Sequence, residues 1–182
     1  MNKGRLEAFS DGVIAIIVTI MVLELAQPAG DSLANFLELW KPLLCYLLSF
    51  MFVAIYWVNH HLILHDTEEI NIKIVWWNIL WLFVLSFIPF TTVWVSNYPT
   101  SWAPVTIYFA DMFLACITFH IIYYRIFKQE NPNGKFKFSP RNIVSIVTYF
   151  LAAAIGGFYP AAAFILVAIV TLWWVIPENK EA

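Results

Sequence analysis

Six apolar blocks account for most of the chain, with short polar segments between them. A helix rises about 1.5 Å per residue, so segments of this length can cross a hydrocarbon core about 30 Å thick. The alternating ten-residue strands of a membrane barrel are not visible, which leaves helices as the spanning elements. We therefore predict an all-α integral membrane protein, a single domain over residues 1–182 with six transmembrane helices at about 6–26, 36–60, 72–97, 102–127, 141–157 and 159–176.

The composition supports this class and excludes others. Hydrophobic residues make up 62% of the chain and charged residues only 12%, and the mean hydropathy is +0.75, far from the values of a soluble domain. The net charge of −2 argues against nucleic acid as a partner. There is no glycine-rich phosphate loop, nucleophile elbow or cysteine-rich metal motif. We expect a protein that is not an enzyme, has no cofactor and has the lipid bilayer as its surroundings.

The placement of lysine and arginine predicts the orientation. If the N-terminus is inside, nine of the ten basic residues fall in inner segments and only Lys41 falls outside. This asymmetry favours a multi-pass protein of the cell membrane with both termini inside. The inner residues are Lys3, Arg5, Lys73, Arg125, Lys128, Lys135, Lys137, Arg141 and Lys180.

Proline, serine and glycine mark the helix boundaries. Pro89 lies within the third span and predicts a kink there, because its ring removes one backbone hydrogen bond. Ser139 followed by Pro140 is a typical helix start. The segment 156–160, with two glycines and a proline, predicts a tight turn between the last two spans.

The first span begins with polar residues that a lipid-facing helix would not carry. A helix that began only at Gly12 would be about 22 Å long at its end near Ala26, too short for the bilayer core, so we expect it to begin near Leu6. A carboxylate at Asp11 would then cost up to about 3 kcal/mol if it faced lipid at depth. Asp11 should therefore face protein or water, and we place Ser10 and Arg5 with it.

The opposite side of this first span carries an apolar stripe broken by one hydroxyl. Helical periodicity places these residues along one line. Ile16, the first of them, lies about 140° from Asp11 around the helix axis. Periodicity by itself favours ordinary bundle packing or lipid contact over the lining of a pore. The stripe consists of Ile16, Thr19, Ile20 and Leu23.

Three motifs carry a resemblance to a known family. The run Arg5-x-x-x-Phe9-Ser10-Asp11 resembles the R-x-x-x-F-S-D signature of the transmembrane protein 175 family, potassium channels of endolysosomes with bacterial homologues. The run 57–61, Trp-Val-Asn-His-His, is similar to the W-x-N-H-H of bacterial members. Asn78, followed by Pro89-Phe90-Thr91, is similar to the N…P-F pattern of the family.

The resemblance implies a potassium channel, weakly to moderately selective over sodium, in a bacterial inner membrane, with the potassium ion as permeant. The pore would lie between the first helices of four identical subunits, without a re-entrant filter loop. Ile16 and Leu23 would form its hydrophobic constriction, with Thr19 as a polar ring between them and Ile20 nearby. A structural polar clamp would hold the pore helix, formed from Arg5, Phe9, Ser10, Asp11, His60, His61, Trp76 and Asn78.

Two other functions fit parts of the sequence. Asp11 and Asp111 are intramembrane carboxylates, which a proton-coupled carrier would titrate, although no inverted repeat is visible. Contact of Asp111 with a neighbour such as a tyrosine is the simpler interpretation. The spacing of His61 and His65 suits a metal site, with His60 beside them, but structural hydrogen bonding fits these histidines better.

Overall fold

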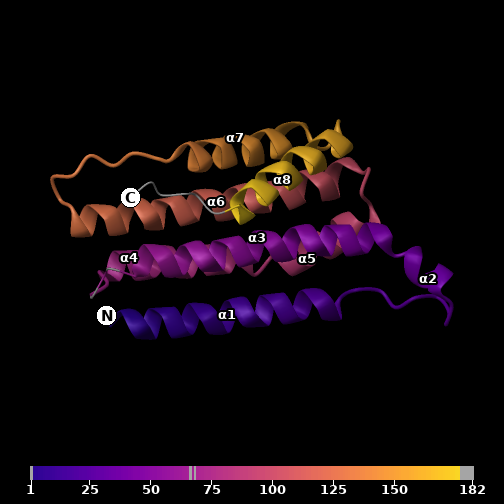
Figure 1. The fold of residues 1–182 in the computed structure, drawn as a ribbon, viewed down its shortest axis with the longest axis horizontal. Coiled ribbons are helices and arrows are strands. Elements are labelled where there is room, and N and C mark those ends of the chain that lie inside the picture. The colour runs from indigo at the N-terminus through magenta and orange to yellow at the C-terminus, as the bar shows by residue number, and fades with distance from the viewer. Residues whose placement is uncertain (1, 66, 68, 177–182) are drawn as a thin grey trace.

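The computed structural model describes residues 2–65, 67 and 69–176, which form an elongated bundle of helices (Figure 1). An isolated bridge between Asn2 and Glu69 is the only β-type pairing among the described residues. The all-helical class predicted from the sequence is confirmed. The helices are α1 (Lys3–Leu23), α2 (Leu33–Leu37), α3 (Trp40–Leu64), α4 (Ile72–Leu85), α5 (Ile88–Asn97), α6 (Trp102–Glu130), α7 (Pro140–Ile155) and α8 (Pro160–Val175).

Helix length separates the apolar segments into two groups. Within the described residues, four segments are long and apolar enough to cross a membrane: α1, α3, the pair α4–α5 and α6. Helices α7 and α8 have 16 residues each, or about 24 Å at the rise of a helix. Their passage through the whole bilayer, and with it the count of six spans, stays a prediction.

The predicted second span was wrong at both ends. Phe36 belongs to the short helix α2, which Ser32 caps by accepting a hydrogen bond from the Asn35 amide. The long helix α3 begins at Trp40 and continues to Leu64, four residues beyond the predicted end at residue 60. Residues 60 and 61 therefore lie inside a helix, where their side chains have fixed directions toward neighbouring helices.

The other boundary signals correspond to features of the structure. Helix α4 ends at Leu85, and Pro89 occupies the first turn of α5, so the third span is interrupted as the proline predicts. Ser139 caps α7 by accepting a hydrogen bond from the Asn142 amide, with Pro140 as the first helical residue. Helices α7 and α8 are joined by the predicted turn at residues 156–159.

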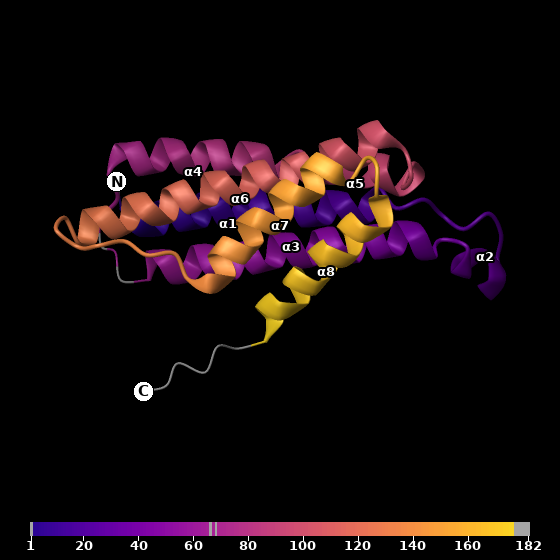
Figure 2. The same ribbon diagram turned by 90° about the horizontal axis from the view of Figure 1, so that it is seen from above.

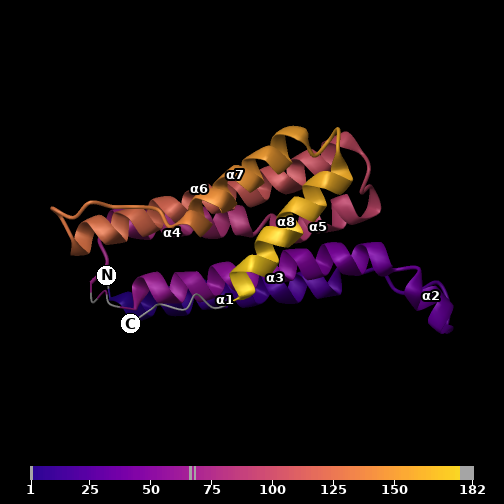
Figure 3. The same cartoon turned by 45° about the horizontal axis from the view of Figure 1, so that its top comes forward.

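The bundle has two distinct ends, and the charges are divided between them. The N-terminus and the α3–α4 and α6–α7 connections share one end, whereas α2 and the α5–α6 and α7–α8 connections share the other (Figures 1 and 3). The first end carries most of the basic residues, as expected for the inner side of a membrane protein. Lys180, which the orientation argument also used, lies outside the described residues.

Helix α1 lies at one side of the bundle and α7 at the other (Figures 1 and 2). Helix α6 packs against α4, α5 and α7, and α1 packs against α3, α4 and α5. Large buried side chains fill the space between these helices, among them Phe52, Trp81, Tyr108, Phe109 and Met112. One long face of α1 is left without a neighbour in the single chain.

A buried set of hydroxyl groups joins α3, α5 and α6. Ser49 Oγ lies 2.7 Å from Thr92 Oγ1 and 2.9 Å from Tyr108 Oη. Thr92 Oγ1 also donates to the Ile88 carbonyl at 2.6 Å. In a low-dielectric interior such bonds are costly to leave unmade. Their mutual contacts therefore fix the relative position of three helices at the centre of the bundle.

The α7–α8 turn predicts a destabilising substitution. A Cβ atom at Gly157 would collide with the Trp102 ring and lie 2.7 Å from Thr106 Oγ1. We expect Gly157→Ala to lower the free energy of unfolding by about 1–3 kcal/mol through overpacking, measured as a lower thermal midpoint in detergent. Gly4→Ala, whose Cβ would have only one ordinary contact at 3.4 Å, is the control. Equal midpoints for the two variants would contradict the packing described here.

Candidate functional site

Polar contacts on one side of α1 attach it to α3. Trp57 Nε1 donates a hydrogen bond of 2.8 Å to Asp11 Oδ1. His61 Nδ1 lies 3.8 Å from Glu7 Oε1, a pair that is ionic only when the imidazole is protonated. The partners are four residues apart on each helix and in opposite chain order. That is the register of two antiparallel helices that face each other along i, i+4 rows.

A third contact extends this register by one helical turn toward the inner end. Lys3 lies four residues before Glu7, and its ammonium Nζ donates to the backbone carbonyl of His65 at 2.7 Å. The same ammonium is 3.9 Å from Glu7 Oε1. We call these three contacts, Lys3–His65, Glu7–His61 and Asp11–Trp57, the polar ladder. Each exposed contact is weak alone, but together they fix the helix in both register and rotation.

Beside the ladder lies a buried triad that also includes α4. Asn78 Nδ2 donates to Ser10 Oγ at 2.9 Å, and Asn78 Oδ1 lies 2.7 Å from His60 Nε2. Because the amide oxygen can only accept, His60 must carry its proton on Nε2. Ser10 Oγ donates in turn to the Leu6 carbonyl at 2.9 Å. The His60 ring stacks on Trp81 at 5.0 Å, so the triad is enclosed in the core.

The ladder and the triad determine which face of α1 is left exposed. The buried residues of α1 follow helical spacing from residue 6 to residue 21. On the opposite side, Ile16 is 60% exposed and Leu23 is 80% exposed in the single chain. Thr19 and Ile20 are exposed as well. The stripe predicted from periodicity is therefore one continuous exposed face of α1.

Three predicted clamp residues are not brought to the clamp. Arg5 and Phe9 are exposed, and they precede Ile16 by eleven and seven residues. At about 100° per residue both lie within about 20° of Ile16 around the helix axis, so they extend the exposed stripe. Trp76, 66% exposed on α4, also points away. These three residues were expected in the clamp from the family resemblance, without regard to the angle of each side chain around its helix.

Five residues that the predicted clamp did not include take part in these contacts: Lys3, Glu7 and His65 of the ladder, and two tryptophans. Trp57 is the hydrogen-bond donor to Asp11, and Trp81 supports His60. The first could have been found from spacing, because Trp57 precedes His61 by the same four residues that separate Glu7 from Asp11. No comparable signal identifies Trp81, since its role depends on how α4 packs against α3.

The residues of the two other candidate sites have partners within the fold. Asp111 is buried and accepts a hydrogen bond of 3.1 Å from Thr91 Oγ1 on α5, so its partner is a threonine rather than the expected tyrosine. His60 faces Asn78, whereas His61 faces Glu7 on another helix. Within the described part of the chain, no three His, Cys, Asp or Glu side chains are grouped to hold a metal ion.

The triad predicts a measurable loss of stability. Asn78→Ala would leave Ser10 and His60 buried without their shared partner, and we expect a loss of about 1–3 kcal/mol in the free energy of unfolding. Asn97→Ala, at an exposed end of α5, is the control and should change little. A Ser10→Ala, Asn78→Ala double-mutant cycle should be non-additive. Additive effects would show that the two side chains do not interact.

Comparisons with known proteins agree with this geometry. The family described as "Endosomal/lysosomal potassium channel TMEM175" matches residues 5–89, which include the triad and the Glu7–His61 and Asp11–Trp57 contacts of the ladder. A potassium channel of Chryseobacterium sp. is 39% identical over 99% of this chain and 96% of its own length. A Gallus gallus relative named as the endosomal/lysosomal proton channel TMEM175 is 26% identical, over 94% of this chain and 38% of that protein.

A solved structure has the same fold. The crystal structure of a lysosomal potassium-selective channel TMEM175 homologue from Chamaesiphon minutus is 26% identical, with a TM-score of 0.72 over 96% of this chain and 98% of that chain. The chain shares its fold with this channel and is 39% identical to a bacterial potassium channel over nearly its full length. The chain belongs to the TMEM175 family.

Proposed function

We propose that this protein is a potassium channel whose pore is lined by the exposed stripe of α1. The observation that carries the proposal is that the polar ladder and the triad hold one side of α1 while the apolar residues of its opposite side are exposed in the single chain. An apolar face that is held in a fixed direction can face the same surface of other subunits around a common pore axis. The full-length similarity to a bacterial potassium channel supports the same function.

The exposed face of α1 continues from the stripe to the N-terminal end of the helix. Successive members are separated by alternating steps of four and three residues from Arg5 through Phe9, Gly12, Ile16 and Thr19 to Leu23. These five steps span 18 residues, an average of 3.6 residues per step, which is the period of an α-helix, so these residues lie on one face of α1. A homotetramer with four copies of α1 around the pore is the assembly we propose, as the family resemblance implies.

In such an assembly Ile16 and Leu23 would form two apolar rings. Seven residues separate them, or about 10 Å along a helix. A narrow apolar ring can exclude water and so prevent conduction without any physical plug. Tilt or rotation of the four helices would widen both rings together, since they lie on the same rigid α1. This arrangement gives a hydrophobic gate with the two constrictions coupled.

Thr19 offers oxygen between those rings. Its hydroxyl donates to the Ile16 carbonyl at 2.8 Å, so its proton is already engaged within the helix. The lone pairs of the hydroxyl oxygen are then left to face a cation. Four such oxygens would partly replace the water that a potassium ion sheds at the apolar rings. Potassium also loses water more easily than sodium, and both effects favour it.

Proton-coupled transport is the second candidate, supported by the two intramembrane carboxylates. Asp11 is bound by Trp57 beside the stripe, and Asp111 lies in the core against Thr91. Under that mechanism Asp11→Asn would abolish coupled transport. In the channel that we propose, Asp11→Asn weakens one step of the ladder and changes assembly or gating.

Potassium flux into proteoliposomes tests the proposal directly. The purified protein should carry fast flux down a potassium gradient, with a proton ionophore as the counter-path, and slower flux of sodium under the same conditions. Flux that requires an imposed proton gradient would contradict the channel and support the carrier.

The stripe predicts a specific leaky variant. Ile16→Asn should make the apolar ring wettable, and we expect flux to rise and the preference for potassium over sodium to fall. Ile169→Asn on α8 is a matched control, because Ile169 is 59% exposed and Ile16 is 60% exposed in the single chain. Unchanged flux in Ile16→Asn, or the same increase in Ile169→Asn, would contradict a constriction at Ile16.

A further inference from the structure

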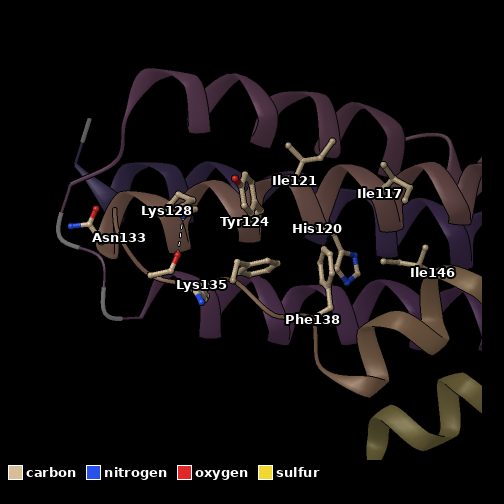
Figure 4. A pocket seen from close by; sticks show the side chains of 11 residues that line it. Ile117, His120, Ile121, Tyr124, Lys128, Asn133, Lys135, Phe138 and Ile146 are labelled. Atoms are coloured by element: carbon tan, nitrogen blue, oxygen red, sulfur yellow. Dashed lines mark hydrogen bonds between the residues drawn. The ribbon is translucent and has the colours of Figure 1, made fainter.

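A groove of about 790 Å³ lies between α6, the start of α7 and the loop at residues 131–139 (Figure 4). It is on the opposite side of the bundle from α1 and at the end that carries the basic residues (Figure 1). Neither the polar ladder nor the exposed stripe contributes to it. The groove therefore requires an explanation separate from the proposed pore.

The loop that forms one wall is fixed against α6 by aromatic contacts. The Phe136 ring packs against Tyr123, Tyr124 and Phe127, with ring centroids 5.1, 5.4 and 5.2 Å away. Phe136 also packs against Phe138 at 4.9 Å. Four aromatic neighbours around one ring hold the loop in a defined position, so the groove is part of the fold.

A lysine and a glycine hold the loop close to the helix. Lys128 Nζ donates to the Gly134 carbonyl at 2.9 Å (Figure 4). A Cβ atom at Gly134 would lie 2.9 Å from Asn131 Cβ and 3.0 Å from Phe127 Cζ, closer than ordinary packing allows. Only a residue without a side chain fits there. The Lys128 ammonium, which bonds to carbonyl groups, keeps its positive charge at the mouth of the groove.

The charge around the groove is strongly positive. Residues 121–145 contain five basic side chains and one acidic side chain, Glu130. Lys128 and Lys135 line the groove itself. Among the described residues, no Asp or Glu forms a salt bridge with either lysine. The end of the groove at Lys128 and Lys135 is therefore suited to bind an anion.

The rest of the groove is apolar and has the length of one membrane leaflet. Ile121 lines it beside His120 and Phe138, and Ile117 and Ile146 line it beyond them, toward the middle of the bundle (Figure 4). Eleven residues of α6 separate Ile117 from Lys128, or about 16 Å at the rise of a helix. Half of a hydrocarbon core about 30 Å thick is about 15 Å, so the apolar wall matches one acyl chain.

We propose that this groove binds an anionic phospholipid of the inner leaflet. Its phosphate would lie at Lys135 beside Lys128, and one acyl chain would lie along Ile117 and Ile121. The combination of a fixed basic head and an apolar wall is the chemistry by which membrane proteins bind such lipids on their cytoplasmic side. The proposal does not depend on ion conduction, because the groove lies away from α1.

Native mass spectrometry of the purified protein, titrated with phosphatidylglycerol or phosphatidylcholine, tests the site. We expect phosphatidylglycerol to bind more tightly, and Lys135→Gln to weaken that binding about fivefold, the effect of one basic residue near an anionic lipid. Lys137→Gln is the matched control, because Lys137 is in the same loop and outside the groove lining. It should change the affinity less than twofold. Ile121→Trp should reduce the binding of both lipids by filling the apolar wall.

Each alternative has its own result in this experiment. Equal losses in Lys135→Gln and Lys137→Gln would show general attraction to a basic loop and overturn the site. Equal affinity for the two lipids would show that the anionic group is not recognised. Full displacement of phosphatidylglycerol by millimolar glycerol phosphate would identify a site for soluble anions and overturn the assignment to a lipid.

Discussion

The polar attachment of α1 to α3 and α4 is the constraint on which the proposed site depends. A smooth apolar helix at the side of a bundle could rotate about its axis with little cost, because lipid and protein offer it similar contacts. The ladder from Lys3 to Asp11 and the buried triad at Ser10 remove that freedom. They do so over the first three turns only. The remaining turns are apolar, and their direction is set by the rigidity of the helix.

The packing of α3 and α4 against the rest of the bundle supports this attachment. Asn78 can reach both Ser10 and His60 because α3 and α4 are held against α6 by the aromatic core around Trp81 and by the Ser49 hydroxyl contacts. These contacts are buried, so each is expensive to break. The side of the molecule with α7 and α8 is more distant from α1. The basic groove at the inner end of that side is the proposed lipid-binding site, and it is separate from α1.

Much of this fold follows from the sequence because two strong signals agree. Apolar blocks of membrane length fix the class and the approximate helices, and Pro89 and Ser139 fix two boundaries. The clamp was predicted only in part. Ser10, Asp11, His60 and Asn78 were expected together, but Arg5 and Trp76 are exposed and Trp57 and Trp81 are present instead. The exact partners depend on the rotation and register of each helix. These are set only when the helices pack together, so the sequence alone does not reveal them. The break between α2 and α3 has no comparable local signal.

Cysteine accessibility along α1, read by potassium flux in liposomes, tests the central claim most directly. The natural Cys45 and Cys116 are buried and provide an unreactive background. Single cysteines at Ile16, Thr19, Ile20 and Leu23 should react with a charged, water-soluble thiol reagent and block the flux. Cysteines at Ile14, Ile17 and Met21, on the buried face of the same helix, should not. Block at the buried positions, or at none of the four exposed ones, would contradict a pore lined by this face of α1.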